Sequence, residues 1–142
     1  MATLHLMVGL PCSGKTKKAR KLEKEYNALL FTPDDARHIK LSDNDTVESI
    51  MWDHASRVLQ LGVDVILDFG FWAKEERESF RERAKNLGVN FKIHYMDVPI
   101  KDLYKRLEKR NKKISDETFI IAKEEMDKYV NIFQPPTNDE LI

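Results

Sequence analysis

The chain has 142 residues, of which 42% are hydrophobic and 34% are charged, and its 24 lysine and arginine residues balance 24 aspartate and glutamate residues. This composition is typical of a folded domain and excludes a disordered chain. A net charge of zero gives no overall attraction for a nucleic-acid backbone, so a polymer partner is not favoured. The single cysteine, Cys12, excludes an internal disulfide and a cysteine-ligated metal site, which favours a cytoplasmic protein.

Apolar runs alternate with helical patterns along the chain. We predict strands near Leu4–Val8, Ala28–Phe31, Val63–Leu67 and Phe91–Tyr95. We predict helices over Lys15–Glu25, from Asp45 to beyond Val58, over Lys74–Leu87, from Pro99 onward and over Asp116–Phe133. This alternation predicts a three-layer α/β fold with a mainly parallel sheet of four to five strands. The opening apolar run is too short to span a bilayer, so no membrane partner is expected.

Two finer expectations concern the second helix and the histidines. The apolar face of the second helix is predicted from residues at three- and four-residue spacing, namely Val47, Ile50, Met51, His54 and Val58. The four histidines are scattered without the spacing of metal ligands, and we assign them no role.

Residues 9–16 carry the strongest motif in the sequence. They match G-x-x-x-x-G-K-[ST] and lie between a predicted strand and a predicted helix, the context that this phosphate-binding loop requires. Glycines allow the backbone to curl so that its N–H groups converge on phosphate oxygens. Lys15 is expected to bridge the β- and γ-phosphates of ATP, and Thr16 to bind Mg²⁺. The full set of expected nucleotide contacts in the loop is Gly9, Pro11, Cys12, Ser13, Gly14, Lys15 and Thr16.

The Cys12 thiol has two possible uses within this loop. It serves either as a small spacer or as an oxidisable thiol, since a helix N-terminus lowers a thiol pKa.

The segment FTPDDAR, residues 31–37, follows the second predicted strand and should share a crevice with the phosphate loop. Asp35 suits the first turn of a helix, which leaves Asp34 as the candidate general base for an attacking hydroxyl. Arg37 is the candidate contact for a substrate or transferring phosphate. In the alternative interpretation, both aspartates only stabilise the helix N-terminus and Arg37 is solvated.

Two further segments bear on the site. Asp68 ends the third predicted strand and is either a magnesium ligand or a turn former. The aromatic residues after it offer a flat surface to a ring-containing acceptor, although core packing of at least two of them is favoured. Arg106 and Arg110 lie four residues apart on one helix face. Both are expected to close over the nucleotide phosphates as part of a lid near residues 106–116, and a solvated basic face is the alternative.

Together, GLPCSGKT, DDAR, LDFGFW and MDVPIKDLYKRLEKRN resemble the small P-loop kinases related to phage polynucleotide kinase, zeta toxins and chloramphenicol phosphotransferase. The likeness covers about residues 3–133. The resemblance implies a nucleotide kinase-like P-loop fold. It implies that Lys15 contacts the phosphates, that Thr16 binds magnesium and that Asp34 is the general base. It also implies that Arg37 contacts a substrate phosphate and that Arg110 is the lid arginine. The FGFW segment departs from the polar residues that follow the third strand in polynucleotide kinase.

We therefore expect a single P-loop kinase domain over residues 1–142, with an extended tail at 134–142 that either lies against the domain or frays. Its expected activity is transfer of the γ-phosphoryl group of ATP, with Mg²⁺, to a hydroxyl of a small-molecule acceptor. Two alternatives are a 5′-hydroxyl polynucleotide kinase and a non-catalytic ATP-binding switch module.

Overall fold

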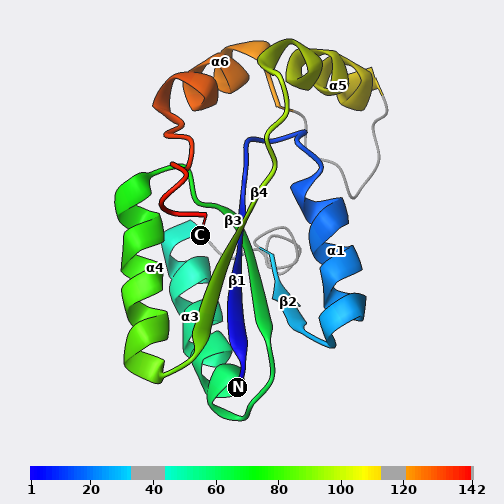
Figure 1. The fold of residues 1–142 in the computed structure, drawn as a ribbon. Helices are drawn as coiled ribbons and strands as arrows, with labels where there is room; N and C mark the ends of the chain where they lie inside the picture. The colour runs from blue at the N-terminus through cyan, green and yellow to red at the C-terminus, as the bar shows by residue number, and fades with distance from the viewer. Residues whose placement is uncertain (33–43, 113–120, 142) are drawn as a thin grey trace.

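The computed structural model describes residues 1–32, 44–112 and 121–141, which form a three-layer α/β fold (Figure 1). One parallel sheet has the strand order β2-β3-β1-β4. Its strands are β1 (Thr3–Val8), β2 (Leu29–Phe31), β3 (Val65–Gly70) and β4 (Asn90–Tyr95). The predicted parallel α/β fold is confirmed, with four strands in the described residues.

The described residues also form five helices: α1 (Lys15–Tyr26), α3 (Asn44–Gln60), α4 (Lys74–Leu87), α5 (Ile100–Lys112) and α6 (Lys123–Ile132). Helix α1 covers one face of the sheet, α3 and α4 cover the other, and α5 and α6 lie across the carboxyl ends of the strands (Figure 1). Within the described ranges, each helix falls short of the combined length and apolarity that a bilayer span requires.

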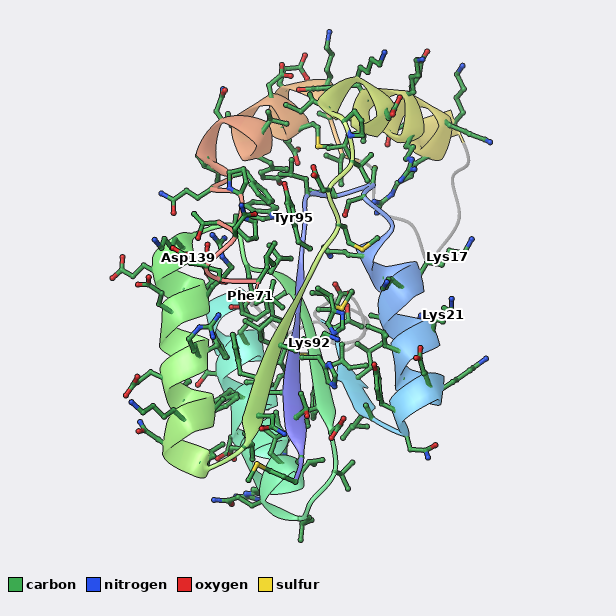
Figure 2. All side chains as sticks on the ribbon, viewed as in Figure 1. Lys17, Lys21, Phe71, Lys92, Tyr95 and Asp139 are labelled. Atoms are coloured by element: carbon green, nitrogen blue, oxygen red, sulfur yellow. The ribbon has the colours of Figure 1, made fainter. Side chains whose placement is uncertain are left out.

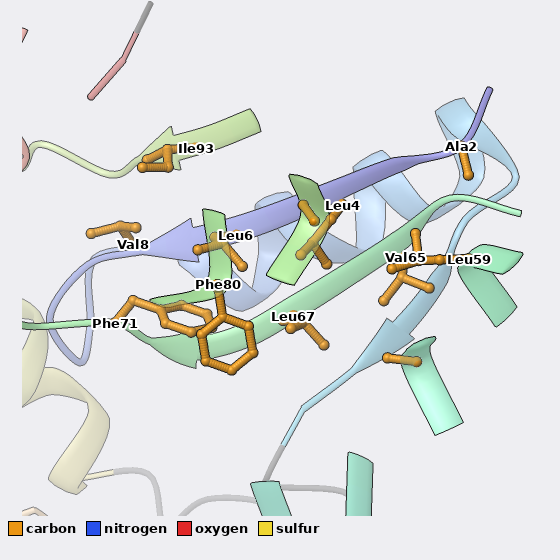
Figure 3. Packing of buried hydrophobic residues seen from close by; sticks show 12 residues of the cluster. Ala2, Leu4, Leu6, Val8, Leu59, Val65, Leu67, Phe71, Phe80 and Ile93 are labelled. Atoms are coloured by element: carbon orange, nitrogen blue, oxygen red, sulfur yellow. The ribbon is translucent and has the colours of Figure 1, made fainter. Parts of the chain in front are cut away.

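The core divides between the two faces of the sheet. Leu4 and Leu6 of β1 belong to the cluster on the α3 and α4 side, where Phe71 and Phe80 pack edge to face (Figure 3). Met7, the alternate residue on β1, belongs to the cluster under α1. Because successive side chains of a strand point to opposite faces, a strand buried on both sides is mainly apolar on both faces, and His5 is the buried polar residue of β1. This explains the near-continuous apolar run at the start of the sequence.

The predicted apolar face of α3 is correct only in part: Val58 packs against the core and Met51 is half-buried, but two of the predicted residues are exposed. Ile50 is 44% exposed and His54 is also exposed, whereas Ala55 and Leu59 are buried, with Trp52 packed edge to face on Phe80. The predicted residues and the set Trp52, Ala55 and Leu59 both recur at helical spacing, so periodicity alone did not show which set faces the core. The large indole at position 52 fixes the helix rotation because it buries more apolar area than Ile50 would.

The last helix begins later than predicted. Ala122 has an extended backbone and α6 starts at Lys123, so the helix predicted from Asp116 does not include residues 121 and 122. The backbone of Ile121 is instead held by the Asn111 side chain, whose amide donates to the Ile121 carbonyl at 2.8 Å and accepts from its N–H at 3.4 Å. These bonds satisfy the backbone groups that a helix would otherwise pair. Residues 116–120 lie outside the described residues.

Two histidines form a buried network that the sequence did not predict. His5 on β1 lies 2.9 Å from His94 on β4, measured between Nδ1 and Nε2, and its other ring nitrogen lies 3.2 Å from an Asp64 carboxylate oxygen. The Tyr26 ring stacks on His5 from α1. Burial lowers the pKa of His94 to about 4, and His5 and Lys92 add to the shift. Burial also lowers the pKa of His5, so both rings are neutral near pH 7.

The free energy of unfolding is expected to fall as the pH is lowered from 7 to 4. The unfolded chain binds a proton at His94 near pH 6.5 and the folded chain only near pH 4, so acid favours the unfolded state. The loss attributable to His94 should be about 2 kcal/mol, because solvent partly screens the charge of this half-buried ring. Urea unfolding at several pH values measures it. His94→Gln should flatten this dependence, and equal slopes in the two proteins would contradict the assignment.

Candidate active site

The phosphate loop joins the end of β1 to the start of α1. Cys12 and Gly14 both have positive φ angles, of 69° and 86°, a conformation that is unusual for the non-glycine residue. Gly14 is the N-cap of α1 and has no side chain that could accept from the first N–H groups of the helix. These donors, together with the positive end of the helix dipole, therefore remain available to an anion.

Lys15 and Thr16 meet Asp68 at the base of this loop. The Lys15 ammonium donates to one Asp68 oxygen at 3.0 Å, and the Thr16 hydroxyl donates to the other at 2.7 Å. The Asp68 side chain is fully buried. Asp68 is on β3, which is parallel to β1, so the sheet brings together residues that lie more than fifty positions apart. Asp68, a predicted magnesium ligand, therefore lies beside Lys15 and Thr16 of the phosphate loop.

The loop also contains a buried polar atom without a partner. Within the described residues, the Ser13 hydroxyl is fully buried and makes no hydrogen bond. An uncompensated buried hydroxyl is costly, so an unpaired one in a loop of this shape points to a ligand. A Cβ atom added at Gly9 would lie 2.7 Å from the Ser13 hydroxyl oxygen. The interior of the loop thus has no room for a side chain at position 9.

Gly9→Ala is expected to weaken ATP binding about tenfold or more, because its methyl group would displace Ser13 and distort the loop. Isothermal titration calorimetry with ATP measures this effect. The matched control is the double variant Gly9→Ala/Ser13→Gly, in which the clashing hydroxyl is removed. With Ser13→Gly as the reference, so that both proteins lack the hydroxyl, adding Gly9→Ala should cost less affinity than it does in the parent chain. An unchanged affinity in Gly9→Ala alone would show that the loop tolerates the methyl group.

Both lid arginines reach the phosphate loop from α5. Arg106 donates to the Cys12 carbonyl at 3.2 Å, and Arg110 lies 3.9 Å from the Cys12 sulfur. Leu103 and Leu107 bury the neighbouring face of the helix, which fixes the direction of the arginines. Two guanidinium groups therefore flank the loop. Their part in catalysis remains a prediction, and the predicted lid beyond residue 112 lies outside the described residues.

The predicted base Asp34, the predicted phosphate contact Arg37 and Asp35, predicted at a helix start, also lie outside the described residues. The chain before them is described: β2 ends at Phe31, and Thr32 is buried. Since β2 and β3 are parallel, β2 ends at the same edge of the sheet as the phosphate loop and Asp68. The roles proposed for the three residues stay predictions.

The aromatic residues after β3 pack inward. Phe71 is 1% exposed and packs on Phe80, and Phe69 is partly buried against the same cluster, so the favoured expectation of core packing for at least two of them is confirmed. Trp72 has a role that the sequence did not indicate. Its indole nitrogen donates to the Gly9 carbonyl at 3.0 Å, which attaches this turn to the phosphate loop.

The donor set suits a magnesium ion that is bound mainly through phosphates. In the described ranges there is no cluster of three or more His, Cys, Asp or Glu side chains that could hold a metal ion. Magnesium sites in kinases instead use one or two protein oxygens together with the nucleotide phosphates. The Thr16 hydroxyl and the Asp68 carboxylate, already in contact at the loop, fit that requirement.

A family model described as an AAA domain matches residues 4–136. The chain belongs to this AAA domain family. Apart from Thr3, the match spans the four strands of the described residues, and it includes the phosphate loop and the α5 arginines. The resemblance to the small P-loop kinases is thereby confirmed at the level of family and fold.

Solved structures share this fold at low sequence identity. Chaetomium thermophilum Kti12 in complex with ADP-AlF3 has a TM-score of 0.79 and 21% identity, covering 94% of this chain and 81% of that chain. A chain of the Pnkp1/Rnl/Hen1 RNA repair complex has a TM-score of 0.71 and 22% identity, covering 92% of this chain but 43% of that chain. Mycobacterium tuberculosis APS kinase CysC in complex with AMPPNP and APS has a TM-score of 0.58 and 18% identity, covering 92% of this chain and 96% of that chain. No match is found among the curated proteins.

Proposed function

We propose that this chain is an ATP-dependent phosphotransferase that moves the γ-phosphoryl group to a hydroxyl of a small-molecule acceptor. The observation that carries this proposal is the pair of hydrogen bonds that Lys15 and Thr16 donate to the buried Asp68 carboxylate. The phosphate loop above them contains the unpaired Ser13 hydroxyl. Two of the structural neighbours were solved with ADP-AlF3 or AMPPNP, which supports nucleotide binding.

The proposed mechanism depends on positioning and charge. The loop N–H groups and Lys15 would hold the β- and γ-phosphates, with Lys15 exchanging its contact with Asp68 for the nucleotide. Thr16 and Asp68 would hold Mg²⁺, which neutralises phosphate charge. Arg110 would stabilise the charge that develops on the transferred group, assisted by Arg106.

On the acceptor side, Asp34 would orient the hydroxyl and accept its proton while the oxygen forms a bond to the γ-phosphorus and the bond to the ADP oxygen breaks. Arg37 would bind a phosphate of the substrate. Both residues follow β2 in the sequence, and the carboxyl end of β2 lies at the same edge of the sheet as the loop. This placement favours a shared crevice for donor and acceptor.

A nucleic-acid end is the second candidate acceptor. The zero net charge of the chain hides an uneven distribution, because α1 carries six basic and two acidic residues among its twelve. Lys17 and Lys21 project from the outer face of this helix, which begins at the phosphate loop (Figure 2). Such a face can attract a phosphate backbone. The likeness to a chain of an RNA repair complex points the same way.

A screen for acceptor-stimulated ADP release tests the proposal and separates the two candidates. Its arms are hydroxyl-bearing metabolites, hydroxyl-bearing antibiotics and 5′-hydroxyl oligonucleotides. Stimulation by a small molecule supports the proposal, and stimulation by oligonucleotides that declines with added salt supports the second candidate. ATP binding without stimulation by any arm would instead support a non-catalytic switch module.

A further inference from the structure

The C-terminal segment Gln134–Glu140 is hydrogen-bonded to the turn that follows β3. Gln134 makes the first attachment, since its backbone N–H donates to the Trp72 carbonyl at 2.8 Å and its side-chain oxygen accepts from the Lys74 N–H at 2.8 Å. One residue of the tail therefore holds the turn on both sides of Ala73. Of the two possibilities left open for the tail, the described residues show the first: Gln134–Glu140 lies against the domain.

Glu140 and Arg77 make the second attachment. The Arg77 side chain is 1% exposed, and its Nε and Nη2 atoms donate to the two Glu140 carboxylate oxygens at 2.8 and 3.3 Å. The remaining Arg77 donor, Nη1, bonds the Phe71 carbonyl at 2.9 Å. Two-point pairing of a buried guanidinium with a carboxylate has a fixed geometry, and loss of one partner leaves a buried charge uncompensated. Arg77 thus links the tail directly to the turn.

The turn itself is strained and faces the phosphate loop. Gly70 and Phe71 have φ angles of 89° and 47°, and the second is unfavourable for a residue with a side chain. The Gly70 carbonyl accepts from the Gly9 N–H at 3.1 Å, and the Trp72 indole donates to the Gly9 carbonyl at 3.0 Å. Both backbone groups of the first loop residue are therefore held by this one turn.

We propose that the Gln134–Glu140 segment acts as a clamp that positions the phosphate loop through the Gly70–Trp72 turn, and that it thereby sets the affinity for the nucleotide. The inference rests on the proposed nucleotide binding. Arg77, Glu140 and Trp72 are positioning residues, since they touch the loop or its support and not the nucleotide. A purely structural tail would change the melting temperature and leave the loop unaffected.

Two variants weaken the clamp at independent points. Glu140→Gln keeps the shape of the side chain and removes its charge, whereas Trp72→Phe keeps an aromatic ring beside Tyr129 and removes the N–H donor to Gly9. The matched control is Asp139→Asn, which changes an exposed carboxylate next to Glu140 (Figure 2). Trp72→Phe leaves the buried ion pair intact, so it stays informative if Glu140→Gln does not fold.

Hydrogen–deuterium exchange of the nucleotide-free protein is the first measurement. Peptides covering residues 9–16 should exchange about five times faster in both variants, as expected for the loss of one hydrogen bond, and at the parent rate in Asp139→Asn. This readout needs no nucleotide, so it tests the clamp even if the parent protein fails to bind ATP and the proposed function is wrong. Parent exchange rates in Glu140→Gln would overturn the role of the tail, and parent rates in Trp72→Phe would overturn the coupling of the turn to the loop.

Calorimetric titration with ATP is the second measurement, at a temperature where all proteins are folded by circular dichroism. The dissociation constant should rise about fivefold or more in Trp72→Phe and Glu140→Gln, and stay within twofold in the control. A lower melting temperature with unchanged ATP affinity would show that the tail only stabilises the fold, and would overturn the proposal.

Discussion

Asp34→Asn is expected to lower turnover by about 10²- to 10⁴-fold while ATP affinity stays near that of the parent protein. Asparagine is nearly the same size as aspartate but cannot accept a proton, so positioning of the donor is retained and activation of the acceptor hydroxyl is lost. Two assays measure the effect, acceptor-dependent ADP release with the acceptor found in the screen and calorimetric binding of ATP. A large loss of turnover with intact binding identifies a base.

The neighbouring aspartate provides the control for this experiment. Asp35→Asn makes the same chemical change one residue away, at a position assigned to the first turn of a helix, where asparagine is also tolerated. Turnover of Asp35→Asn should remain within a few-fold of the parent value. A reversed result, with Asp35→Asn inactive and Asp34→Asn active, would move the base to Asp35, and full activity in both variants would contradict carboxylate catalysis in this segment.

Lys15→Met is expected to lower kcat/KM by about a thousandfold or more, since the charge that contacts the phosphates in both ground and transition states is lost. It should also lower the melting temperature, because the fully buried Asp68 carboxylate loses its cation and keeps the Thr16 hydroxyl as a partner. Steady-state kinetics and thermal unfolding measure the two effects separately.

A second substitution distinguishes misfolding from loss of function. Lys15→Met/Asp68→Asn removes both charges of the pair, so stability should recover in part while activity stays low. Lys24→Met is the surface control, since it removes an exposed lysine from the opposite end of the same helix. Normal kcat/KM in Lys15→Met would contradict the assignment of the phosphate loop.

The features predicted well from sequence depend on local chemistry. The phosphate loop needs glycine at fixed positions, and Gly14 with its φ of 86° shows why. Helix α4 ends at Leu87, as predicted, and Gly88 follows it in the left-handed conformation that glycine adopts without strain. Alternation of strands and helices implied the parallel sheet, which in turn brought Asp68 to Lys15.

The features missed depend on contacts distant in sequence. The Arg77–Glu140 pair joins residues 63 positions apart, and neither residue stands out among the many charges of the chain. The His5–His94 network spans 89 positions and depends on the pairing of β1 with β4. Only the aromatic run after Asp68 gave a local signal, and it did not reveal that Trp72 donates to Gly9.

Transfer of label from ATP carrying ³²P in its γ-phosphate tests the central claim most directly. The protein, Mg²⁺ and the acceptor pool of the screen are incubated together, and the products are separated by thin-layer chromatography. We expect a labelled ester of a hydroxyl compound, formed by the parent protein and not by Lys15→Met. Label that stays in ATP, or that appears solely as inorganic phosphate with every acceptor, would show that the protein is not a phosphotransferase for these compounds.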